Sequence, residues 1–125
     1  HVSDVMRSGE AVPRSAPGDR LAEVLMEMSG KGMGFTVVLD PECRVLGVFT
    51  DGDLRRTLDA DVSIKGSAVQ TVMTTTYSAV PPEMLAAEAL HLMDTRKINA
   101  LPVVHADGTL AGALNMHDLL RAGVA

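Results

Sequence analysis

The sequence contains an internal repeat, and this repeat limits the possible folds more than any other feature. The segment Val2–Met6 recurs as Val69–Met73, a shift of 67 residues. Farther along, apolar positions in residues 21–28 recur in residues 86–93 at a shift of 65, with the i, i+3, i+4, i+7 spacing of one helix face. The same shift relates later glycines and aspartates of the two halves. A constant shift through successive elements predicts two duplicated units.

Each repeat is predicted to hold a short helical segment, a brief extended piece, an amphipathic helix, two strands with a tight turn, and a closing helix. The long helix of the first repeat is expected to begin at about Asp19, as N-cap, and to stop at the Gly30/Gly32 pair. The corresponding helix of the second repeat is expected to begin at Pro82, because proline suits the first helical position, and to end near residues 95–97. The turns between the strands are predicted at residues 41–44 and at Asp107-Gly108.

The predicted fold is therefore an α/β (α+β) fold made of two β-α-β-β-α units. The first unit covers residues 1–60, a linker covers residues 61–68, and the second unit covers residues 69–125. A unit of about 60 residues buries little surface alone, so we expect the two to pack as a pseudo-two-fold pair. Met28 and Met93 fall on matching positions and are expected in the cores.

The composition argues against several classes of protein. The chain has 125 residues, a formal net charge of −5, and few aromatic residues, whereas nucleic-acid surfaces are basic and carry stacking rings. The single cysteine, Cys43, excludes an internal disulfide. No apolar run approaches the roughly 18–20 residues that span a bilayer, and the start lacks signal-peptide features, so we expect a cytoplasmic protein without membrane contact. Because the chain begins with His1, we expect that an upstream part has been removed.

The most informative polar patterns lie where the second strand of each unit meets the closing helix. In Gly47–Arg56, Thr50 is a natural N-cap and Asp53 lies in the first helical turn. A helix N-terminus favours phosphate, and one carboxylate can accept hydrogen bonds from both hydroxyls of a ribose. Thr50-x-x-Asp53 is equally a capping-box pattern, and Asn115-x-x-Asp118 can be interpreted in the same two ways. Both roles can hold together, because a carboxylate has more than one acceptor site.

The order of these patterns resembles a pair of CBS (cystathionine-β-synthase) domains, with Val-Met near the start of each unit and Gly-x-x-Thr/Asn-x-x-Asp at each junction. More narrowly, Gly47–Arg56 and Met116–Gly123 resemble the CBS pair at the C-terminal end of arabinose 5-phosphate isomerases, which serve lipopolysaccharide synthesis. The resemblance implies a regulatory module of an isomerase, not a catalyst. It also implies an effector in a cleft between the units, either an adenosine nucleotide or a nucleotide sugar such as CMP-Kdo. The expected partners are an upstream sugar-isomerase domain and further copies in a homo-oligomer.

The resemblance also carries residue roles onto this sequence. The family's aspartate holds ribose hydroxyls, and residues 33–35 and 99–102 are expected to frame the base. Several cations and one histidine lie near the expected cleft, although each could instead face solvent. The candidate ligand-binding residues are Thr50, Asp53, Asn115, Asp118, Met33, Gly34, Phe35, Asn99, Ala100, Leu101, Pro102, Arg96, Lys97, His117 and Arg56.

Catalysis and metal binding find little support in the sequence. No Ser/His/Asp or Cys/His set and no phosphate-loop glycine pattern is visible, and the histidines lack ligand spacing. We therefore expect no catalytic residue, metal or bound cofactor in this chain. A structural alternative stays open, namely an oligomerisation element with no physiological ligand. Apolar helix faces and few aromatic residues are compatible with this element as well as with a ligand-binding module.

Overall fold

The computed structural model describes residues 1–124, which form two compact units. The first, called here the central unit, comprises residues 13–77. The second, called the terminal unit, comprises residues 1–12 together with the described residues from 78 onward. Each has its own hairpin, helices and core.

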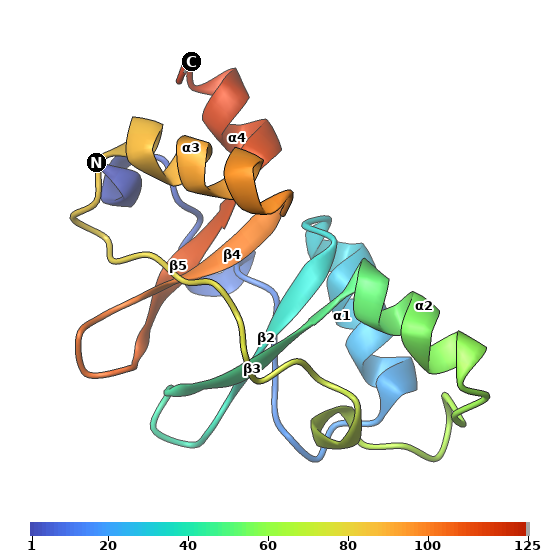
Figure 1. Cartoon of the computed structure of the whole chain (residues 1–125). Helices are drawn as coiled ribbons and strands as arrows, with labels where there is room; N and C mark the ends of the chain where they lie inside the picture. Colours follow the sequence, from blue (N-terminus) through green and yellow to red (C-terminus); the bar gives the residue numbers. More distant parts are fainter. Residues whose placement is uncertain (125) are drawn as a thin grey trace. The chain divides into compact units, whose positions relative to one another are not determined.

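The central unit has the predicted β-α-β-β-α order (Figure 1). Its elements are β1 (Arg14–Ser15), α1 (Leu21–Lys31), β2 (Phe35–Leu39), β3 (Val45–Thr50) and α2 (Asp51–Asp59), followed by the 3-10 helix η3 (Val69–Thr71). Strand β1 is parallel to β2, and β2 is antiparallel to β3. Strand β3 runs directly into α2 without a loop, so the junction is a sharp corner.

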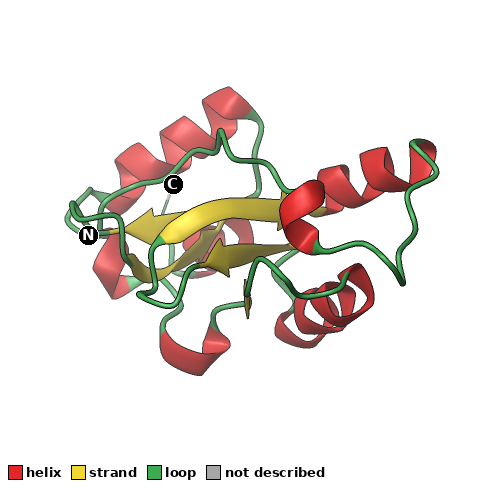
Figure 2. Cartoon of the chain, turned by 90° about the horizontal axis from the view of Figure 1, so that it is seen from below, coloured by secondary structure: helices red, strands yellow, loops and turns green. Residues whose placement is uncertain are grey.

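The terminal unit repeats this order with a reduced first strand. It contains η1 (Val2–Asp4), η2 (Gly9–Ala11), α3 (Ala86–Arg96), β4 (Ala100–Val104), β5 (Leu110–Asn115) and α4 (Met116–Arg121). In place of a first strand, Val80 forms a single parallel bridge to Val103. The segment between α2 and α3 is loop apart from η3 (Figure 1). Figure 2 distinguishes the helices, strands and loops of the chain by colour.

The hydrophobic cores of the two units use corresponding positions. Met28 and Met93 are 5% and 0% exposed, which confirms their predicted place in the cores. The central core consists of Leu21, Val24, Met28, Val38, Phe49 and Val69, and the terminal core of Val2, Val80, Ala89, Met93, Leu101, Val103, Leu114 and Leu119. The periodic apolar pattern therefore identified the buried face of each long helix.

The N-cap of α1 is one residue after the predicted position and the predicted start of α3 is wrong, while the helices end near the predicted residues, with Gly30 inside α1 and Gly32 at its end. Helix α1 has Arg20 as N-cap, because the Asp19 carboxylate accepts instead from the Ala16 N–H at 2.9 Å. Pro82 lies in a turn, and α3 begins only after Leu85. Gly32 ends α1 in the left-handed conformation with φ of 67°. At the end of α3, Lys97 adopts the same conformation with φ of 55°.

The short Val-Met segments are exchanged between the sequence repeats. Segment 2–6 packs in the terminal unit, where Val2 belongs to the core, although it lies at the start of the first repeat. Val69 likewise belongs to the central core. The compact units are thus divided differently from the sequence boundaries 1–60 and 69–125.

None of the helices in the described part of the chain is long and apolar enough to cross a membrane.

Candidate functional site

The corner between β3 and α2 is closed by a reciprocal capping box. The Thr50 hydroxyl accepts from the Asp53 N–H at 3.1 Å, and the Asp53 Oδ2 accepts from the Thr50 N–H at 2.9 Å. The capping interpretation of this motif is therefore confirmed. Because capping fixes the first turn, the Asp53 carboxylate is held beside the end of β3.

The corner between β5 and α4 has only half of this arrangement. The Asn115 Oδ1 accepts from the Asp118 N–H at 2.7 Å, so Asn115 replaces threonine as the N-cap. The Asp118 carboxylate does not accept from the Asn115 N–H, as a capping box would require, and instead forms an ion pair with Arg7 at 2.8 Å. The two aspartates thus occupy equivalent positions but have different partners.

The sequence reasoning missed the two residues that complete these corners, Thr74 and Arg7. The Thr74 hydroxyl donates to Asp53 Oδ1 at 2.7 Å, while Arg7 donates through Nε to Asp118 Oδ2 at 2.8 Å and through Nη2 to Oδ1 at 3.3 Å. A signal was present, because both residues directly follow the repeated Val-Met segments. Their equivalence would have predicted a shared role.

Backbone pairing places both of these residues at the corners. Thr74 exchanges two backbone hydrogen bonds with Val48 of β3, at 2.8 and 2.9 Å. Arg7 exchanges two with Ala113 of β5, at 2.8 and 2.9 Å. Each Val-Met segment therefore acts as a short extra strand beside the hairpin that carries the corner.

The repeated glycines of the junctions allow this close approach. A Cβ at Gly47 would lie 2.7 Å from the Thr74 carbonyl oxygen and 3.0 Å from the Met73 sulfur. A Cβ at Gly112 would meet the Arg7 carbonyl oxygen still more closely, and the Met6 sulfur at 2.6 Å. Any side chain at either position would push the segment away from the strand.

Electrostatics keep the Asp53 carboxylate ionised. Burial raises the pKa of this carboxyl, but hydrogen bonds from Thr74, from the backbone and hydroxyl of Thr50, and from Arg56 outweigh burial, so the pKa lies below its ordinary value. Asp53 is 4% exposed, whereas the Arg56 side chain that donates to it is 71% exposed. The corner therefore holds a stable anion with a solvent-facing cation beside it.

Several of the predicted base-framing residues lie next to the corner of their own unit. Gly34 accepts from the Asp51 N–H at 3.1 Å, and Phe35 pairs with Thr50. In the same way, the Asn99 carbonyl accepts from the Met116 N–H at 2.8 Å. Ala100 pairs with the cap residue of α4. Met33, beside Gly34, is buried at 5% exposure.

Other predicted residues are committed to structural contacts. The Leu101 side chain belongs to the terminal core, and Pro102 beside it is buried. Arg96 donates to the Ser78 hydroxyl at 2.7 Å. Lys97 is the exposed C-cap of α3. His117 is exposed and lies 2.7 Å from an Arg121 nitrogen. The ligand roles of all these residues stay predictions.

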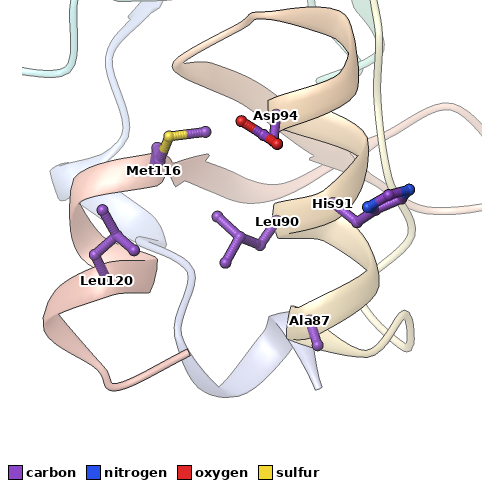
Figure 3. A pocket seen from close by; sticks show the side chains of 6 residues that line it. All are labelled: Ala87, Leu90, His91, Asp94, Met116 and Leu120. Carbon is purple, nitrogen blue, oxygen red and sulfur yellow. The ribbon is translucent and has the colours of Figure 1, made fainter. Parts of the chain in front are cut away.

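A separate hollow of about 370 Å³ lies between α3 and α4. Leu90 of α3 faces Met116 and Leu120 of α4 across it (Figure 3). Ala87, His91 and Asp94 complete its lining, so none of the candidate ligand-binding residues contributes to it. Its lining is of mixed character, with the apolar side chains of Leu90, Met116 and Leu120 beside the polar His91 and Asp94, and it lies apart from both corners.

Within residues 1–124, no group of three or more His, Cys, Asp or Glu side chains could hold a metal ion.

Comparison with known proteins gives a family match and close relatives. Residues 69–125 match the family model of the CBS domain. Over 98% of its length the chain is 53% identical to arabinose 5-phosphate isomerase KdsD of Pseudomonas aeruginosa, and 42% identical to the KdsD of Escherichia coli K12. The chain spans 38% and 37% of the length of these curated relatives.

Solved structures show the same fold. The crystal structure of CBSX2 in complex with AMP matches with a TM-score of 0.83 and 26% identity, covering 98% of this chain and 94% of that one. A putative acetoin utilization protein (AcuB) from Vibrio cholerae matches with a TM-score of 0.86 and 22% identity, covering 98% and 89%.

Proposed function

The chain is a pair of CBS domains that matches arabinose 5-phosphate isomerases, and from this premise we propose that it is the regulatory, nucleotide-binding module of such an isomerase. In this proposal the module itself performs no catalysis. It binds an effector and thereby alters the activity or assembly of an attached sugar-isomerase domain in the cytoplasm. An effector can do this only if it binds one state of the enzyme better than another.

The observation that carries the proposal is the duplicated corner with its ionised aspartate. In the central unit, hydrogen bonds keep the Asp53 carboxylate charged at the first turn of α2. An ionised carboxylate is a strong acceptor for the two neighbouring hydroxyls of a ribose, and the N-terminus of α2 favours a phosphate nearby. The structural match to a CBS protein crystallised with AMP supports a nucleotide as the ligand class.

The effector itself is proposed to be an adenosine nucleotide or CMP-Kdo. Both carry a ribose and at least one phosphate, so the same corner chemistry serves either. CMP-Kdo would be the natural choice for feedback, because the resemblance places the isomerase in the synthesis of Kdo. The base-framing residues 33–35 and 99–102 would then discriminate adenine from cytosine.

A thermal-shift panel with AMP, ATP, CMP and CMP-Kdo tests nucleotide binding. At about a hundred times its Kd, a nucleotide adds roughly 2.7 kcal/mol to the free energy of unfolding, which raises the melting temperature by on the order of 10 °C. Asp53→Asn should remove most of that shift. The matched control is Asp59→Asn, which removes the same charge from the exposed far end of α2 and should leave the shift intact. Absence of a shift with all four nucleotides would refute nucleotide binding.

Regulation requires the complete protein. The isomerase activity of the full-length enzyme should change when the binding nucleotide is added, and Asp53→Asn should abolish the change while keeping the basal rate. An unchanged rate at saturating nucleotide would contradict the regulatory role.

A second candidate function is homo-oligomer assembly without a ligand. The hollow between α3 and α4 favours it, because Leu120 is 58% exposed beside Leu90 and Met116. In this case a second copy of the chain would cover the hollow. Sedimentation of wild type and of Leu120→Asp would reveal such assembly, and equal association with and without nucleotide would favour it over regulation.

A further inference from the structure

The β3–α2 corner with Asp53 is called here the central corner, and the β5–α4 corner with Asp118 the terminal corner. The residues that bind these two aspartates, Thr74 and Arg7, occupy equivalent positions of the repeat but differ in chemistry. Thr74 donates one neutral hydroxyl to Asp53, whereas Arg7 donates two charged N–H groups to Asp118. We infer that Arg7 closes the terminal corner to ribose, so that each chain binds a single ribonucleotide, at Asp53. This inference rests on the proposed function. It adds which of the two corners binds the nucleotide, and it names Arg7 as the residue that excludes the nucleotide from the other corner.

At the terminal corner both carboxylate oxygens already accept from one guanidinium. The Arg7 and Asp118 side chains are 29% and 15% exposed, so the pair is largely withdrawn from water. Two charge-assisted hydrogen bonds in a fork are stronger than the hydrogen bonds of neutral hydroxyls. A ribose would have to displace the guanidinium and leave a partly buried cation without its anion, which is unfavourable.

At the central corner the side chains that donate to Asp53 can rotate or move away to make room for a ligand. The Thr74 and Thr50 hydroxyls both donate to Asp53, and a hydroxyl that rotates can accept from a ligand as readily as it donates. The remaining side-chain donor is Arg56, which is 71% exposed. Arg56 holds the 4% exposed Asp53 carboxylate through a single nitrogen, and when it turns to a phosphate the Thr50 N–H and the two hydroxyls still donate to that carboxylate. Asp53 therefore exchanges one of its separate donors for a ribose hydroxyl more readily than Asp118, whose two donors belong to one guanidinium.

Calorimetric titration of the whole chain with AMP and with CMP measures the number of sites. We expect one site per chain, weakened tenfold or more by Asp53→Asn and less than threefold by Asp118→Asn. The 2′-deoxy and 3′-deoxy forms of AMP serve as ligand controls, and each should bind at least tenfold more weakly because it lacks one hydroxyl of the pair.

Exchanging the two deciding residues gives a sharper test. Arg7→Thr should raise the stoichiometry from one AMP to two, because it gives the terminal corner the hydroxyl that Thr74 gives the central one. Thr74→Arg should weaken binding at Asp53 tenfold or more. Circular dichroism and thermal unfolding check that each variant folds. If Arg7→Thr does not fold, the comparison of Asp53→Asn with Asp118→Asn in the otherwise unchanged chain still decides.

The possible failures are distinguishable. Two equal sites in the wild type, or a single site lost in Asp118→Asn and kept in Asp53→Asn, would overturn the role of Arg7 while leaving nucleotide binding intact. An unchanged stoichiometry in a folded Arg7→Thr variant would overturn it as well. If the wild type binds none of AMP, ATP, CMP and CMP-Kdo, the proposed function fails, and this inference fails with it.

Discussion

Replacing Gly112 by alanine tests whether the Val-Met segment is truly the support of the corner. The new Cβ would lie 2.6 Å from the Met6 sulfur and closer still to the Arg7 carbonyl oxygen. The sulfur can move, because it belongs to a flexible side chain, but the carbonyl oxygen is backbone and accepts from the Ala113 N–H at 2.9 Å. The segment must therefore shift away from β5.

The expected cost of Gly112→Ala follows from these contacts. Overpacking of a tight site costs typically 1–3 kcal/mol, and weakening the two hydrogen bonds between Arg7 and Ala113 adds up to about 1 kcal/mol each. We expect a loss of about 3 kcal/mol in the free energy of unfolding. With a urea m-value of roughly 2 kcal/mol/M, the midpoint falls by about 1.5 M.

Two further glycine variants calibrate the measurement. Gly47→Ala should cost somewhat less, about 2 kcal/mol, because its Cβ would lie 2.7 Å from the Thr74 carbonyl oxygen. Gly30→Ala meets nothing within 4 Å and lies inside α1, so it should stabilise by about 0.5–1 kcal/mol. An unchanged urea midpoint for Gly112→Ala would refute the close approach of this segment to β5.

Two other predictions concern the central corner. Because the pKa of Asp53 lies below its ordinary value, its stabilising contribution is present above the unfolded-state pKa of about 3.9 and is lost as pH falls through the lowered folded-state pKa. In wild type the free energy of unfolding should therefore fall as the pH drops below about 4.5, and in Asp53→Asn it should fall less. Urea unfolding at several pH values measures this, and an equal fall in both proteins would contradict the prediction. Thr50→Ala removes the N-cap of α2 and should cost about 1 kcal/mol, seen as a melting point lower by roughly 4 °C, whereas Thr50→Ser should stay near wild type.

Local patterns predicted the elements of the fold well, because they report directly on burial and backbone geometry. The Asp107-Gly108 pair does form the turn between β4 and β5, with Gly108 at φ of 89°. The helix starts were less predictable. Pro82 has a suitable φ for a first turn, yet the Met84 N–H donates to the Pro81 carbonyl, and this turn delays α3.

The partners of the two aspartates could not be obtained from local patterns. Spacing predicted the caps Thr50 and Asn115, since a cap and its acceptor lie three residues apart. The Arg7–Asp118 ion pair joins residues 111 positions apart. Only the exchange of the Val-Met segments brings them together, and the repeat alone does not reveal which unit each segment joins.

A crystal structure of the chain with bound AMP or CMP-Kdo tests the central claim most directly. We predict that the two ribose hydroxyls of the nucleotide donate to the Asp53 carboxylate, while Arg7 still holds Asp118. A nucleotide bound away from Asp53, for example in the hollow between α3 and α4, would contradict this claim.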